Sequence, residues 1–142
     1  MKGEPEPNAA IELHDSTLER IESSGDEVIA VITAYVHRSA GRPGIDAGTG
    51  WSQSLHLRFS RGRATGSLEA IPMELLDGRL DVSSESFANV IPMPLNRIGA
   101  SRLELRSWNE AKVVLEGDGV MGSFIGPAKY IEEFAANNEP NS

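Results

Sequence analysis

The segment that most constrains the fold is 27–37, which reads Glu-Val-Ile-Ala-Val-Ile-Thr-Ala-Tyr-Val-His. Strict alternation and β-branched residues are typical of a β-strand. The alternation gives two faces, one with Val28, Ala30, Ile32, Ala34 and Val36, the other with Ile29, Val31, Thr33, Tyr35 and His37. Because both faces are largely apolar, we expect a central strand that is covered on two sides.

The other predicted strands are short and separated by turn residues: 11–13, 51–60, 64–71, 73–76, 79–82, 100–106, 112–116 and 120–125. Segment 17–23 has two interpretations, because Ser16 and Glu19 form a helical capping box, whereas Gly25 and Asp26 favour a hairpin; we choose a strand. Asp77-Gly78 predicts a further two-residue hairpin. Segment 130–136 is either a last strand or one helical turn.

Segment 87–95 contains Pro92 and Pro94, and proline within a sheet is confined to edges and bulges. We therefore predict an edge strand there. Short strands with regular turn signals and no long amphipathic helix predict an all-β fold, either an antiparallel barrel or a sandwich. At 142 residues the chain has the size of one domain. We expect disordered residues at 1–10 and 137–142 and a single β domain between them.

The net charge of -8 and the pI near 4.8 argue against nucleic-acid binding, which needs clustered lysine and arginine. They favour a basic protein partner or a small ligand. The chain has no cysteine, which excludes disulfides and thiolate chemistry. It has no apolar run of about 20 residues and its first residues are charged, so we expect no membrane span, no signal peptide and a cytoplasmic location.

The candidate chemistry lies in the histidines. His14 and His37 stand at predicted strand ends, and Asp15 or Asp46 is the carboxylate that would complete a metal or acid–base site with them. No His-x-x-x-His spacing supports a metal, and neighbouring His14 and Asp15 point to opposite faces of a strand. We therefore predict no metal, no cofactor and no catalytic residue, and we favour histidines that bond to loop backbone.

The glycine-rich loop after His37 is the second candidate. Arg38 and Arg42 are able to clamp an anionic group such as a carboxylate. The alternative is an ordered loop in which one of these arginines pairs with Asp46. The glycines match no phosphate-binding fingerprint. We expect Trp51, which ends the loop, to belong to the core or to cover the loop.

The residues Leu13-His14-Asp15-Ser16, followed by Gly25-Asp26 and a long apolar strand, resemble the start of small bacterial β-rich domains of unknown function. Some proteins with a similar start are immunity proteins that neutralise toxins. The resemblance covers about the first third of the chain. It implies a small β domain that binds a protein, and it implies no catalytic residue.

Three functional hypotheses follow. The first is a non-enzymatic domain that binds a basic protein, of the immunity type, through His14, Asp15, His37, Arg38, Arg42, Asp46 and Trp51. The second is a small-ligand or metal-binding barrel, with or without enzymatic activity, that uses His14, Asp15 and His37. The third is an oligomerising domain, such as a homodimer, that pairs through an edge strand near 91–95.

Overall fold

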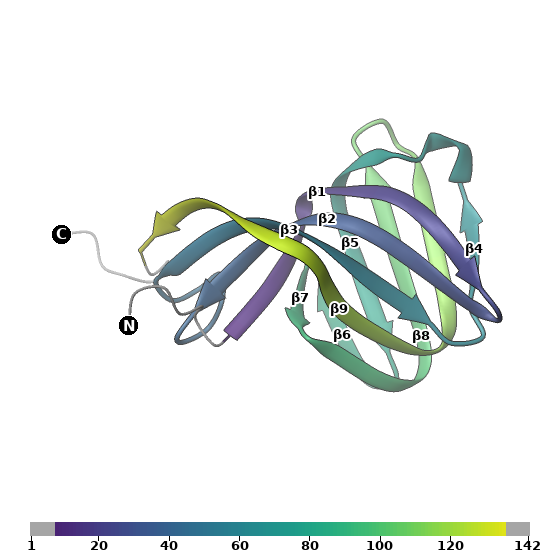
Figure 1. Ribbon diagram of the computed structural model, residues 1–142. Coiled ribbons are helices and arrows are strands. Elements are labelled where there is room, and N and C mark those ends of the chain that lie inside the picture. The colour runs from purple at the N-terminus through teal and green to yellow at the C-terminus, as the bar shows by residue number, and fades with distance from the viewer. Residues whose placement is uncertain (1–7, 136–142) are drawn as a thin grey trace.

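The computed structural model describes residues 8–135, and these residues form nine β-strands (Figure 1). The strands are β1 (Asn8–Ser24), β2 (Glu27–Ser39), β3 (Gly48–Phe59), β4 (Arg63–Gly66), β5 (Met73–Val82), β6 (Glu85–Ala88), β7 (Val90–Met93), β8 (Leu95–Ser107) and β9 (Lys112–Phe134). A three-residue 3₁₀ turn, η1 (Leu68–Ala70), is the only helical segment in this range. No described helix has the length and apolar character needed to cross a membrane.

All pairings between strands are antiparallel, which confirms the predicted all-β antiparallel fold. Six strands follow one another in a ring, in the order β1, β2, β3, β9, β8 and β5. The ring closes where β5 returns to β1 through the pairs Thr17–Glu74 and Leu18–Met73. Because this closure has only two residue pairs, the molecule is barrel-like but uneven.

The core lies inside this ring. Ala30, Ile32 and Val36 of the central strand are 0% exposed, and they pack with leucines of β3, β8 and β9. On the opposite face of β2, Ile29 and Val31 are only 4% and 3% exposed. The predicted two-sided burial of this strand is therefore confirmed. Strand formation at 17–23 is also confirmed, because these residues belong to β1.

Four strands continue beyond the ring and form a projecting sheet, which we call the arm (Figure 1). Its strand segments pair in the order β1, β2, β3, β9: 8–12, 35–39, 48–52 and 129–134. The outer face of the arm continues the solvent-facing side of the ring, and its inner face continues the core side. Strand β7 pairs with 9–12 at one border of the arm. Segment 87–95 thus lies at the sheet edge, as its prolines predict.

The Asp77-Gly78 hairpin prediction is wrong, because β5 runs straight through both residues and turns only after Val82. Gly78 serves close packing instead. A Cβ at this position would lie 2.7 Å from Leu13 Cδ1 and 2.9 Å from the Glu104 carbonyl oxygen. The glycine therefore lets two walls of the ring approach each other. In the sequence alone, a glycine needed for close packing cannot be told from a glycine needed for a turn.

The predicted strands at 112–116, 120–125 and 130–136 are one long strand, β9, that bends at its glycines. Its last part is a strand through Phe134, which decides against a helical turn there. The predicted strand 64–71 ends early at Gly66, which has φ +103°. Of the terminal residues expected to be disordered, 8–10 belong to β1, whereas 1–7 and 137–142 lie outside the described residues.

Candidate functional site

A β-bulge marks the point where β1 passes from the arm into the ring. The register against β2 shifts between Glu12 and Thr17, and Asp15 has φ +71°. The Ser16 hydroxyl bridges the gap, since it donates to the Glu12 carbonyl at 2.5 Å and accepts from the Tyr35 N–H at 3.1 Å. Ser16 is only 1% exposed. Asp15 and Ser16 therefore bend β1, and the strand predicted at 11–13 continues through them.

Tyr35 is the centre of the outer face of the arm. Its ring crosses from β2 over Gly50 of β3, and its hydroxyl donates to a carboxylate oxygen of Glu132 on β9. A Cβ on Gly50 would lie only 2.7 Å from Tyr35 Cζ. Glycine at position 50 of β3 therefore allows the Tyr35 side chain of β2 to reach β9.

His37 and Glu12 complete this group. The His37 ring packs edge-on against Tyr35, with 4.9 Å between the ring centroids. Its Nε2 lies 3.6 Å from Glu12 Oε1. The loop after β2 folds back over the imidazole, because a Cβ on Gly44 would lie 3.7 Å from His37 Cδ2. We call Glu12, Tyr35, His37 and Glu132 the arm cluster.

The arm cluster is acidic. Burial and the hydrogen bond to Glu132 raise the pKa of Tyr35 well above its usual range, and Glu132, Glu12 and Asp15 add to the rise by their negative charge. Tyr35 therefore stays a neutral donor at physiological pH. Glu12 and Glu132 form no ion pair with lysine or arginine within residues 8–135. Two carboxylates thus face solvent on the arm without a fixed cation beside them.

His14 and Asp15 lie at the bulge, next to the arm cluster but outside it. His14 Nδ1 donates to the Leu76 carbonyl at 2.9 Å, and the ring packs against Trp108 with 5.7 Å between centroids. The hydrogen bond to Leu76 raises the pKa of His14, and the charges of Asp15, Glu12 and Asp77 add to the rise. His14 thus bonds to backbone as expected, but the carbonyl belongs to strand β5 and not to a loop.

The glycine-rich loop is held by its own contacts. The Arg42 guanidinium lies 3.3 Å from Asp46 Oδ2, and the Arg42 N–H donates to the same oxygen at 2.6 Å. The predicted internal pairing of the loop is therefore present between Arg42 and Asp46. Asn8 at the start of β1 adds a bond to the Gly41 carbonyl at 2.7 Å.

Arg38 and Trp51 lie on the inner face of the arm. Arg38 donates to Gln53 Oε1 at 2.8 Å and its guanidinium lies over the Phe124 ring, 5.1 Å from the centroid. Trp51 packs edge-on against Tyr130 and against the border of the core, as expected for a core-associated tryptophan. The seven predicted site residues thus fall into three groups: the bulge, the outer face with the loop beside it, and the inner face.

The described residues include no group of three or more histidine, aspartate or glutamate side chains that is able to hold a metal ion. His37 approaches Glu12, whereas His14 approaches Asp15. The hypothesis of a metal site built from both histidines therefore finds no support in their geometry.

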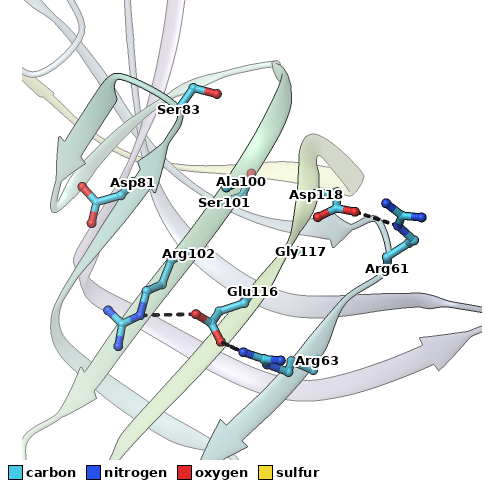
Figure 2. A pocket seen from close by; sticks show the side chains of 10 residues that line it. All are labelled: Arg61, Arg63, Asp81, Ser83, Ala100, Ser101, Arg102, Glu116, Gly117 and Asp118. Carbon is cyan, nitrogen blue, oxygen red and sulfur yellow. Dashed lines mark hydrogen bonds and ion pairs between the residues drawn. The ribbon is translucent and has the colours of Figure 1, made fainter.

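A second polar surface lies on the ring, between β4, β5, β8 and β9 (Figure 2). It is a hollow of about 440 Å³, lined by both arginines and carboxylates. Figure 2 shows Glu116 between Arg102 and Arg63. Arg102 Nε lies 3.7 Å from Glu116 Oε2, and Arg63 Nη2 lies 2.9 Å from Glu116 Oε1. Arg61 Nε lies 2.6 Å from Asp118 Oδ2. These opposite charges neutralise one another, so the hollow presents little net charge to a ligand.

Comparison with known proteins adds no family to this geometry. No family model matches the chain, and neither a curated protein nor a solved structure matches it. The function is therefore inferred from the residues of this chain and their arrangement.

Sequence reasoning identified His37 but missed the other members of the arm cluster, Glu12, Tyr35 and Glu132. Tyr35 shares a face with His37 in the predicted central strand, and this alternation was a usable signal. Glu132 gave no such signal, because Tyr35 and Glu132 are 97 positions apart in the sequence. They meet only because β9 pairs with β3.

Proposed function

We propose that this protein is a binding domain that holds a basic protein partner on the outer face of the arm. The observation that carries the proposal is the arm cluster, in which Glu12 approaches the His37 imidazole and Glu132 accepts a hydrogen bond from the Tyr35 hydroxyl. Neither carboxylate forms an ion pair with an arginine or lysine of residues 8–135. A lysine or arginine of a partner supplies the missing cation and forms charge-assisted hydrogen bonds.

The surroundings of the arm cluster favour a protein over a small molecule. Its side chains stand on a pleated sheet of several strands, and Glu132 is exposed whereas Glu12 is half-buried. An aromatic ring beside carboxylates suits the polar and apolar parts of a long cationic side chain. Net charge of -8 adds long-range attraction for a basic partner and speeds encounter.

An immunity-type protein that sequesters a basic toxin is the most concrete form of this proposal. The resemblance of Leu13-His14-Asp15-Ser16 to the start of such proteins supports it, and these residues form the bulge that positions Glu12 beside Tyr35. In this form the partner's own active-site cations would be the groups that the arm cluster covers.

Affinity capture with matched variants tests the proposal. The immobilised protein is exposed to a lysate of its source organism at low ionic strength, in parallel with Glu12→Gln/Glu132→Gln and with a control, Glu69→Gln/Glu110→Gln. Both doubles remove two negative charges, and the control residues are exposed and lie outside the arm. We expect a basic protein that salt elutes, retained by wild type and control and bound at least about tenfold more weakly by the arm variant.

Equal retention of the same protein by all three forms would place binding elsewhere on the surface. Recovery of no basic protein at low ionic strength would remove the proposal.

A further inference from the structure

A hollow of about 490 Å³ lies at the base of the arm. Here β9 leaves its regular pairing with β3, because residues 126–128 stand opposite the single residue Gln53. Ser52 is the cross-strand partner of Tyr35 on one side and of Lys129 on the other, so all three side chains project from the outer face. The hollow therefore lies directly beside the arm cluster.

The lining of the hollow carries donors that the described residues leave unused. The Ser52 hydroxyl and the Lys129 ammonium have no hydrogen-bond or ion-pair partner within residues 8–135. The Thr33 and Ser54 hydroxyls share one contact of 3.4 Å, which is long for a hydrogen bond between hydroxyls. Hydroxyl and ammonium groups gathered around one space are suited to bind the oxygens of a carboxylate.

The charges around the hollow favour a carboxylate that comes together with a cation. Glu12 and Glu132 lie on the same face and the chain has a net charge of -8, so an isolated anion is repelled. A ligand with a cation for the arm cluster avoids this cost, because each of its charges meets an opposite charge. Glu132 and Lys129 lie opposite Gly50 and Ser52, which are two residues apart on β3 and hence about 7 Å apart along the strand.

We propose that the hollow is a carboxylate subsite of the partner-binding surface, and that the partner presents an extended segment with a basic and an acidic residue two positions apart. Residues i and i+2 of an extended chain project from one face at this spacing. The basic side chain binds Glu12 and Glu132, and the acidic side chain binds Lys129 and the Ser52 hydroxyl. This inference rests on the proposed function, because the arm cluster has to hold the cation.

Selection of random linear peptides displayed on phage tests the subsite, with the full chain immobilised at low ionic strength. We expect the enriched peptides to carry lysine or arginine and aspartate or glutamate in i, i+2 spacing. One enriched peptide is then synthesised with its acidic residue and with the corresponding amide. The Kd of both peptides is measured on wild type, on Lys129→Gln and on a control, Lys112→Gln, whose exposed lysine lies outside the arm and the hollow.

The two peptides should differ only where Lys129 is present. On wild type and the control we expect the amide peptide to bind about three- to fivefold more weakly than the acidic peptide, as for the loss of one exposed ion pair. On Lys129→Gln the two peptides should bind alike, because the carboxylate has lost its cation.

Enriched peptides without an acidic residue at this spacing, or no enriched peptide at all, would overturn the inference. So would an equal preference for the acidic peptide on Lys129→Gln. The arm variant Glu12→Gln/Glu132→Gln separates this failure from that of the proposed function. If basic peptides that need no acidic residue bind the arm variant more weakly than wild type, the arm cluster still holds the cation and only the subsite is lost. Peptides that bind the arm variant as tightly as wild type would contradict both.

Discussion

Two surfaces of this molecule use their carboxylates differently. On the ring, β5, β8, β9 and β4 carry a charged ladder in which acidic and basic residues alternate across strands: Arg63, Asp77, Arg79, Asp81, Arg102, Glu104, Arg106 and Glu116. On the arm, Glu12 and Glu132 contact an imidazole and a phenol. The ladder is close to neutral as a surface, and the arm cluster is negative.

The difference shows that strand register decides what a surface charge does. In the ladder, Asp77 lies opposite Arg106 in the pairing of β5 with β8, and the two make a bidentate contact at 2.6 and 2.9 Å. In the arm, Glu132 lies opposite Gly50, so it meets the tyrosine that crosses the glycine. Ladder carboxylates therefore act within the fold, whereas those of the arm are available to a partner.

The largest expected effect is from Gly50→Ala, which breaks the arm cluster. The added Cβ occupies the space of the Tyr35 ring, since it would lie 2.7 Å from Cζ. The ring has to leave Glu132, and we expect a loss of about 1–3 kcal/mol in the free energy of unfolding, as for overpacking. Urea denaturation measures this loss.

The same substitution in a Tyr35→Ala background is the control. Because the obstructing ring is absent there, Gly50→Ala should cost much less than in wild type. An equal cost in both backgrounds would mean that glycine at position 50 serves the backbone and not the crossing of Tyr35.

A smaller effect on the free energy of unfolding is expected from single charge removals that compare the charged ladder with the arm cluster. Asp77→Asn removes a bidentate ion pair and should reduce stability at pH 7 by about 0.5 kcal/mol, because both partners are well exposed. Glu12→Gln, which removes a charge from the acidic arm, should leave stability nearly unchanged or slightly raised. Urea unfolding at low and high salt compares the two, and equal losses would contradict the distinction between the surfaces.

The Asp77 effect has a defined pH window. The hydrogen bond from Arg106 lowers the pKa of Asp77 in the folded protein. The ion pair therefore stabilises the folded protein above the pKa of Asp77 in the unfolded chain, about 3.9. This stabilisation is lost as the pH falls through the lower pKa of the folded protein. Wild type and Asp77→Asn should converge in stability under strongly acidic conditions.

The smallest expected effect is at the bulge, between the two surfaces. The bond to Leu76 raises the pKa of His14, so protonated His14 stabilises the fold. This contribution is fully present below the pKa of histidine in the unfolded chain, about 6.5. It is lost as the pH rises through the higher pKa of His14 in the folded protein. His14→Gln should therefore flatten the decline of the melting temperature across neutral pH; an unchanged profile would show that His14 titrates without such coupling.

Parts of the site could be predicted from the sequence and parts could not. Period-two alternation at 27–37 indicated both the central strand and the shared face of Tyr35 and His37. The Arg42–Asp46 pair was accessible because the two residues lie four positions apart in one loop. The hairpin prediction at Asp77-Gly78 was wrong because a glycine needed for close packing looks the same in the sequence as a glycine needed for a turn. Glu132 was out of reach because its contact depends on which strands become neighbours.

The sequence by itself determined that this chain is an acidic all-β domain built around a doubly buried strand, because alternation, turn residues and net charge are local or additive properties. Only the tertiary structure decided that the ring closes through β1 and β5, and that Tyr35 reaches Glu132 over Gly50. It also decided that, among residues 8–135, β9 beyond Gly122 pairs with β3 alone. Each of these depends on the register between distant strands. A shift by one residue reverses the face of every side chain, so no local pattern specifies the result.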